Sequence, residues 1–277
     1  PDVAWENIRR TVDKLDVDHV VYRPPREFIR RLFRYLLCNQ EERGAVYTVS
    51  YVYAPIFEGE ALKIATERGI PLVLAGYSPG QPEPERMLYE FSRELICHTD
   101  WTPPELRSCP ELSSRDHARF WNPAFYPEGT EFPRYLAPFH AWPYDQEKIM
   151  EKVTDLGLVS TTRKASPIMS NYPINWLLMY SDLMNFGYNP YAPEFADLIR
   201  EGKASLAHWK LMAPTVDLMI KHKVLLGREV KGSMDWLSLT DADLRITKKR
   251  GAYDPELGSA FPLPAEGARP RSLEELA

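Results

Sequence analysis

Residues 61–79 have the sequence ALKIATERGIPLVLAGYSP, and this stretch decides the predicted fold. Its first part continues a helix that we expect over about residues 54–67, and Gly69 follows at the place of a glycine C-cap. The apolar run at residues 70–76 is bounded by turn signals, which is typical of a strand buried in a parallel sheet. The stretch therefore predicts a helix that leads into a buried parallel strand.

The preceding residues extend this pattern. Residues 4–37 have the sequence AWENIRRTVDKLDVDHVVYRPPREFIRRLFRYLL. Apolar side chains recur at spacings of three and four in residues 4–15 and again after Pro24-Pro25, which predicts two amphipathic helices with a short strand at residues 18–22 between them. The order helix, strand, helix, helix, strand predicts an α/β fold with a partial doubly wound parallel sheet, in which ligands bind beyond the carboxyl ends of the strands.

Beyond residue 77 the sequence predicts a mostly helical region. The expected helices cover residues 83–96, 111–121, 145–156, 173–186, 193–201 and 205–223. We expect an α/β domain at residues 1–98, a helical C-terminal domain at 99–247 and an extended polar tail at 248–277. Because two strands are too few for such a sheet and Pro1 is not a Met, we expect the other strands upstream of residue 1 or in another chain.

Composition excludes several classes of protein. The chain of 277 residues is 44% hydrophobic and 26% charged, which is ordinary for a globular protein. A net charge of −5 does not favour a nucleic-acid surface, and no apolar run approaches the roughly 20 residues that span a bilayer. The three cysteines form neither a CxxC pair nor an even disulfide framework, so we expect a cytoplasmic protein.

The elements in residues 4–76 resemble the PP-loop ATP-pyrophosphatase superfamily, whose fold is adenine nucleotide alpha-hydrolase-like (HUP). Similarity to its N-acetyl sugar amidotransferase branch is carried by residues 4–37 and 61–79, by YLAPFHAWPYDQEKIMEKVTDLGL at 135–158 and by FGYNPYAPEFADLIREGKASLAHW at 186–209. The resemblance implies a HUP/PP-loop-like sheet with a mostly helical C-terminal region. It also implies an enzyme that uses ATP and Mg²⁺ to activate a substrate oxygen as an AMP ester, which ammonia or a sulfur donor then displaces.

The chain departs from this family at the loop that holds the phosphates. The SGGxDS motif is absent, and GYSPGQ at residues 76–81 is no substitute because it lacks the paired glycines and the Asp. The zinc-binding CxxC pairs of the amidotransferase branch are also absent. We therefore do not expect these 277 residues to hydrolyse ATP unaided: the loop lies upstream, belongs to a partner, or has been lost.

The predicted nucleotide contacts follow the second strand. Gly76, Tyr77, Ser78 and Gln81, with Glu83 nearby, lie at its carboxyl end, where the resemblance implies that backbone groups bind the adenine edge and Tyr77 stacks on the ring. An ordinary Pro/Gly turn accounts for the same residues equally well.

The predicted substrate contacts are arginines. Arg26, Arg30 and Arg34 recur every four residues, with Arg31 beside them, and would bind pyrophosphate, an acidic sugar or RNA. Arg115 lies in a second polar cluster, with Asp116 and His117. A solvated helix face is the alternative for the stripe, and a structural role is the alternative for the cluster.

Other reactive side chains have no clear pattern. Cys38 lies where sulfur-transferring relatives place a cysteine, but a second cysteine does not follow, and a small buried side chain is the alternative. A site with Cys97 and Cys109 would require the fold to bring all three together. His98 and His117 have no nucleophile pattern or metal-ligand spacing near them, so no catalytic residue and no metal ligand is assigned.

Three functions are consistent with this sequence. The first is an ATP-dependent adenylating amidotransferase or ligase that acts on a small molecule such as a sugar and receives ammonia or sulfur from a partner protein. The second is a non-catalytic binding or scaffold subunit derived from the PP-loop fold, which seven Trp and the Pro-rich loops suit. The third is tRNA thiolation, which the negative charge does not favour. A homodimer is the default assembly.

Overall fold

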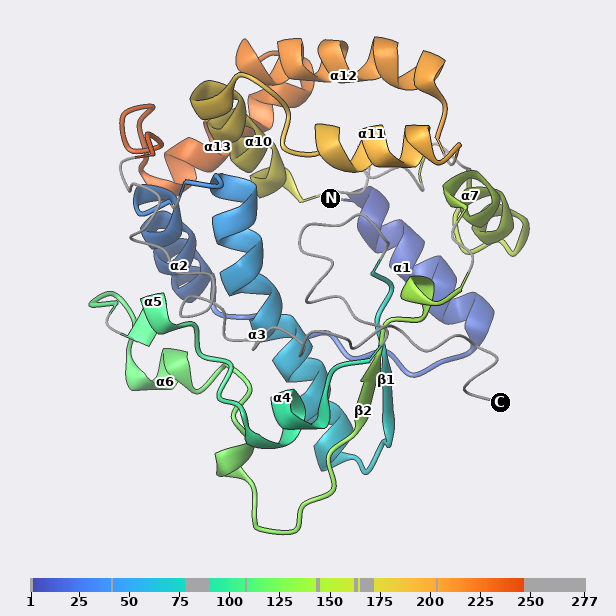
Figure 1. Ribbon diagram of the computed structural model, residues 1–277, viewed down its shortest axis with the longest axis vertical. Coiled ribbons are helices and arrows are strands. Elements are labelled where there is room, and N and C mark those ends of the chain that lie inside the picture. Colours follow the sequence, from blue (N-terminus) through green and yellow to red (C-terminus); the bar gives the residue numbers. More distant parts are fainter. Residues whose placement is uncertain are drawn as a thin grey trace. The chain divides into compact units, whose positions relative to one another are not determined.

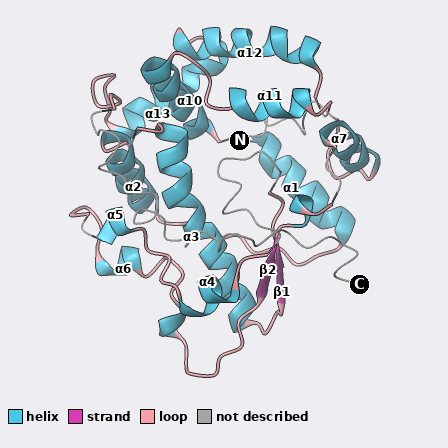
Figure 2. Ribbon diagram, viewed as in Figure 1, coloured by secondary structure: helices cyan, strands magenta, loops and turns pink. Residues whose placement is uncertain are grey.

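The computed structural model describes residues 2–40, 42–77, 90–107, 109–142, 145–161, 164, 172–202 and 204–246. In these ranges the chain is mostly helical, and its strands form one two-stranded parallel sheet (Figures 1 and 2). The chain divides into two compact units, Pro1–Arg30 with Tyr144–Arg245 and Arg31–Pro143 with Ile246–Ala277. The expected boundary between residues 98 and 99 lies inside the second unit, and the division into domains stays a prediction.

The first unit is built from helices. They are α1 (Asp2–Leu15), the start of α2 (Arg26–Cys38), α7 (Gln146–Asp155), α10 (Pro173–Phe186), α11 (Ala192–Arg200), α12 (Leu206–Lys221) and α13 (Arg228–Leu237), with a 3-10 turn η3 (Leu225–Gly227) before the last. Residues 175–182 of α10 are buried on every side, and this helix packs against α12 and α13. A helix that is apolar all round is expected at the centre of a core, which is where α10 lies in this unit.

The second unit combines helices with the sheet. It contains the rest of α2, α3 (Ala45–Glu67), β1 (Leu72–Leu74), α4 (Arg93–His98), α5 (Pro104–Arg107), α6 (Ser114–His117), β2 (Arg134–Leu136) and the 3-10 turns η1 (Pro123–Phe125) and η2 (Pro138–His140). Its aromatic core includes Trp101 and Trp121, which are fully buried. Their indole N–H groups donate to the carbonyl oxygens of Leu95 and Ile96, both at 2.9 Å, so neither buried donor is left unsatisfied.

Helices with strong local signals are confirmed where the sequence predicts them. α10 occupies residues 173–186. α7 begins after Asp145, whose carboxylate accepts from the Lys148 N–H at 3.1 Å, and Gly157 follows its end with φ 72°. α12 contains Pro214 in its interior, as expected for the helix predicted at residues 205–223.

Two helix predictions are wrong in extent. α3 starts at Ala45 rather than near residue 54, after Gly44 at φ 104°, and Pro55 lies inside it. The helix predicted at residues 111–121 is reduced to α6, because the backbone beyond it turns away: the Trp121 carbonyl accepts from the Trp101 N–H at 2.9 Å. Of the helix predicted at 83–96, residues 83–89 lie outside the described residues, and α4 begins at Arg93.

The strand predictions have a mixed outcome. The strand expected at residues 18–22 is wrong, since this segment is irregular and Val20 and Val21 are exposed; two adjacent valines do not make an alternating face for a sheet. β1 lies inside the expected run 70–76 and is parallel to β2, but it is not buried, because Leu74 is 62% exposed. A doubly wound sheet beyond this pair stays a prediction.

Two further expectations concern the C-terminal tail and membrane-spanning helices. The tail expected at 248–277 lies outside the described residues. None of the helices within the described ranges has the length and apolar character needed to cross a membrane.

Candidate functional site

The carboxyl ends of β1 and β2 meet at one edge of the sheet. The register pairs Leu74 with Leu136, the last residue of each strand. The pairing extends one residue further, since the Ala75 N–H donates to the Leu136 carbonyl at 2.8 Å. In parallel sheets this edge is where ligands bind, so the residues that follow β1 form the candidate site.

Gly76 is the open part of this site. It is exposed, and a Cβ atom added to it would meet no other atom within 4 Å. The described residues therefore leave space on the side of Gly76 where a side chain would lie, and its role as a nucleotide contact stays a prediction. Ser78 and Gln81, the other two predicted contacts, lie outside the described residues, as does Glu83.

Tyr77 is anchored by its hydroxyl group. The Tyr77 hydroxyl donates to Oε1 of Glu58 and lies 3.4 Å from the hydroxyl oxygen of Tyr135, and its ring packs against the aromatic core (compare the positions of α3, β1 and β2 in Figure 1). Tyr77 thus holds the chain in place after β1. A base that stacks on this ring has access only to the part that the core leaves uncovered.

Glu58 and Tyr135 complete a buried polar cluster that the sequence did not reveal. Glu58 lies on α3 and is 5% exposed. Burial, together with the negative charge of Glu58, raises the pKa of both Tyr77 and Tyr135, so both phenols stay protonated near neutral pH. Glu58 shares a face of α3 with buried Leu62 and Ala65, at spacings of four and seven. In the sequence, a charged residue on this otherwise apolar helix face was the sign that could have revealed the buried cluster.

A close helix contact positions Glu58. A Cβ atom at Gly59 would lie 2.9 Å from the Trp121 backbone nitrogen and 3.0 Å from the Trp121 Cβ. Only glycine allows this approach without a shift, and Trp121 belongs to the core against which Tyr77 packs. α3, the aromatic core and Tyr77 are therefore in direct contact with one another.

The arginine stripe lies on α2 as predicted, but Arg26 and Arg30 make contacts within the chain. The Arg30 Nε donates to Glu27 Oε2 at 2.9 Å. The Arg26 guanidinium lies 5.8 Å from the ring centroid of Trp236. Arg34 is partly buried. These contacts are with other side chains of the same chain, and the substrate role of the stripe stays a prediction.

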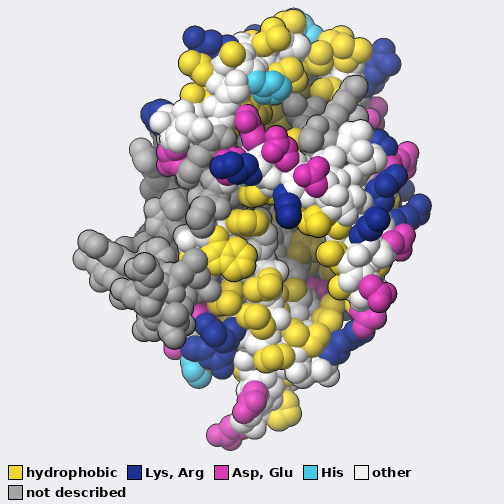
Figure 3. All heavy atoms as spheres, turned by 90° about the vertical axis from the view of Figure 1, so that its right-hand side faces the viewer, with side chains coloured by type: hydrophobic (Ala, Val, Ile, Leu, Met, Phe, Trp, Pro, Cys, Tyr) yellow, Lys and Arg dark blue, Asp and Glu magenta, His cyan; other side chains and the backbone are white. Residues whose placement is uncertain are grey.

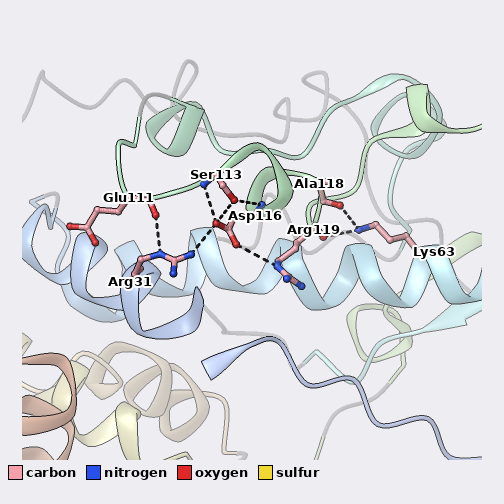
Figure 4. A network of polar contacts seen from close by, with 7 residues as sticks. All are labelled: Arg31, Lys63, Glu111, Ser113, Asp116, Ala118 and Arg119. Carbon is pink, nitrogen blue, oxygen red and sulfur yellow. Dashed lines mark hydrogen bonds and ion pairs between the residues drawn. The ribbon is translucent and has the colours of Figure 1, made fainter. Parts of the chain in front are cut away.

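Arg31, beside the stripe, belongs to a structural network (Figure 4). Its Nε donates to the Glu111 carbonyl at 2.9 Å, and its Nη2 donates to Asp116 Oδ2 at 3.0 Å. The same oxygen of Asp116 accepts from the N–H and hydroxyl of Ser113, at 3.0 and 2.7 Å, which closes a capping box at α6. Arg115, the predicted substrate residue, is exposed on α6, outside this network.

The network sets the charge state of Asp116. Burial alone would raise the pKa of this carboxyl, but hydrogen bonds from Ser113 and the charge of Arg31 outweigh it, so the pKa lies below its usual value. Lys63 of α3 binds the residues that follow α6: its ammonium group donates to the carbonyls of Ala118 and Arg119 at 3.1 and 2.8 Å (Figure 4). The contacts of Asp116 and Lys63 are with the chain itself and indicate a structural role.

The remaining candidate side chains do not converge. Cys109 is buried, and burial raises the pKa of its thiol, which makes it a poor nucleophile. Cys38 is the last residue of α2 and is half-buried. The His117 ring nitrogen lies 2.9 Å from the Leu106 carbonyl, a local contact. Within the described ranges no three His, Cys, Asp or Glu side chains gather as a metal site.

Comparison of the chain with protein-family models, with curated proteins and with solved structures finds no match.

Proposed function

We propose that the second unit is an adenine-nucleotide-binding module of PP-loop type, and that the protein is an ATP-dependent adenylating amidotransferase or ligase acting in the cytoplasm. One observation supports this most directly. At the carboxyl end of the parallel β1–β2 pair, the exposed Gly76 backbone lies next to Tyr77, which the buried carboxylate of Glu58 anchors. This is the position and the rigidity that recognition of a base edge by backbone groups requires.

The described residues fit only one part of ATP. Gly76 offers space and backbone hydrogen-bonding groups for the adenine. The 277 residues contain no SGGxDS loop for the phosphates, and no described cluster of acidic side chains suits Mg²⁺. We therefore assign to this unit the binding of the base and no step of the phosphoryl chemistry.

Calorimetric titration of the chain with ATP, adenosine and GTP tests this assignment. We expect ATP and adenosine to bind with similar affinity and GTP to bind more weakly, because the base and not the phosphates makes the contacts. Gly76→Val fills the open space with a branched side chain and is expected to weaken adenosine binding at least about tenfold. The matched control is Gly232→Ala on α13, where a Cβ atom also meets nothing within 4 Å. Failure of adenosine to bind, or equal binding by Gly76→Val, would rule the assignment out.

A non-catalytic binding subunit is the second candidate, and the edge of β1 favours it. The Arg134 N–H donates to the Pro71 carbonyl and the Ala75 N–H donates to Leu136, so residues 71, 73 and 75 direct their polar groups toward β2. Leu72 and Leu74 consequently direct theirs away from β2, and both side chains are exposed. An apolar strand edge without a charged residue is typical of a surface that pairs with another strand. Nucleotide binding that is absent while a strand partner binds would favour this candidate.

A further inference from the structure

α12 is apolar on two opposite faces. Val216 and Ile220 are buried in the first unit, whereas Leu211 and Leu218 are 70% and 59% exposed. A helix with one apolar face needs one neighbour, and a helix that is apolar all round is expected to be covered on both sides. The sequence of α12 therefore indicates burial of a face that the described residues leave exposed.

The exposed apolar side chains follow a regular spacing. Ala207, Leu211, Pro214 and Leu218 are all exposed and are separated by four, three and four residues; we call them the α12 seam. This spacing places them on one line along the helix, as in the seam of a coiled coil. Figure 3 shows hydrophobic side chains gathered at the top of the view, where α12 lies in Figure 1, with basic side chains at the sides.

We propose that the α12 seam is the interface of a homodimer, in which the helices of two copies pack antiparallel across a two-fold axis. The spacing four, three, four is the same in either direction, so a reversed copy presents a matching row. Ala207 then faces Leu218 of the partner subunit, and Leu211 faces Pro214 of the partner subunit. Each larger side chain meets a smaller one, which is the condition for close packing at such an axis.

The charges along α12 are consistent with a second copy as the occupant, and the area of the face determines how strong the dimer is. A helix of 16 residues is about 24 Å long and about 10 Å wide with its side chains. Such a face covers about 240 Å² per copy, or about 480 Å² in total, which is below the roughly 1,000 Å² of a stable specific interface and predicts a weak dimer. In this register Lys210 faces Thr215 of the partner subunit and His208 faces Asp217 of the partner subunit, so no like charges meet.

Sedimentation of the full chain between about 1 and 200 µM tests the proposal. We expect a monomer–dimer equilibrium with a dissociation constant in the micromolar range. Leu211→Lys should weaken it at least about tenfold, because it places two ammonium groups in the seam. Leu15→Lys, at an exposed leucine on α1, is the matched control and should leave the equilibrium unchanged. Both substitutions are at exposed positions, so circular dichroism should show the parent fold.

Cysteine crosslinking tests the direction of packing. The double variant Ala207→Cys with Leu218→Cys should form a covalent dimer on mild oxidation, with the parent and its three cysteines as background. Leu218→Cys alone should not, because the two copies of residue 218 lie about 16 Å apart along the helices, beyond the reach of a disulfide. A chain that stays monomeric throughout, or a dimer that survives Leu211→Lys, would overturn the proposal. Crosslinking of the single variant would overturn the antiparallel arrangement.

Discussion

Gly59→Ala and Gly232→Ala are chemically identical changes inside two helices, and the structure predicts opposite effects. Helix propensity alone favours alanine over glycine by about 0.8–1 kcal/mol at both positions. At Gly232 on α13 a Cβ atom meets nothing within 4 Å, so the full benefit is expected. At Gly59 on α3 the new atom would lie 2.9 Å from the Trp121 backbone nitrogen, which cannot rotate aside as a side chain would.

The size of the effect at Gly59 follows from this overlap. Ordinary contacts of a Cβ atom start near 3.4 Å, so α3 or the Trp121 backbone must shift by about half an ångström. Overpacking of this kind costs about 1–3 kcal/mol, against a propensity gain of about 1 kcal/mol. We therefore expect Gly59→Ala to lower the free energy of unfolding by up to about 2 kcal/mol and Gly232→Ala to raise it by about 0.8–1 kcal/mol.

Urea unfolding followed by tryptophan fluorescence and by far-ultraviolet circular dichroism measures both changes. Trp101 and Trp121 are fully buried in the second unit and report on the neighbourhood of Gly59. Gly232 belongs to the first unit, so each variant is compared with the parent through its own transition. If Gly59→Ala stabilises the protein as much as Gly232→Ala does, α3 does not approach Trp121 as closely as described, and the packing around Glu58 differs from the one described.

Three further substitutions test other parts of the second unit. Asp116→Ala removes the capping box at α6 and the ion pair with Arg31, so the free energy of unfolding should fall by about 2–3 kcal/mol at pH 7 in urea titrations. Because the pKa of Asp116 is lower in the folded chain than the usual 3.8, its stabilisation is complete above that value and is lost at lower pH. The difference in stability between the parent and the variant should therefore shrink as the pH falls below about 3.8, and a constant difference would contradict the charged role of Asp116. Tyr77→Phe removes the hydrogen bond donated to Glu58 and should cost about 1–3 kcal/mol, whereas an unchanged thermal midpoint would show that the hydroxyl is not held there. Leu74→Lys should change stability by less than about 0.5 kcal/mol, since this side chain is exposed, and a large loss would mean that β1 is covered.

Local signals account for the helices that the sequence predicted well. Asp145 and Gly157 mark the ends of α7, and the apolar run of α10 is bounded by Pro173 and Gly187. The start of α3 was missed because Pro55 is typical of the first turn of a helix. Once an apolar helix is held by tertiary packing, it tolerates the loss of one backbone hydrogen bond, so the proline does not mark a boundary here.

The sheet and the candidate site depend on contacts that local patterns do not encode. β2 follows β1 by some 60 residues, and its three residues carry no alternation that a sequence pattern would detect. Gly76 was proposed as a site residue because it ends an apolar run, but the contact of Tyr77 with Glu58 joins positions 19 residues apart on different elements. The sequence predicted where the strand ends, but only the packing of α3 brings the carboxylate of Glu58 into contact with Tyr77.

That carboxylate is the part of the site that distinguishes the two proposed functions. Burying a carboxylate costs several kcal/mol, and apolar side chains of similar volume often replace such a group without loss of stability. A scaffold therefore has no need of Glu58, whereas a site that reads a base through its backbone needs Tyr77, and hence Gly76, fixed in one position. The double variant Glu58→Leu with Tyr77→Phe should keep at least the stability of Tyr77→Phe alone while weakening adenosine binding at least about tenfold. Adenosine binding equal to that of the parent would show that the contact serves packing alone.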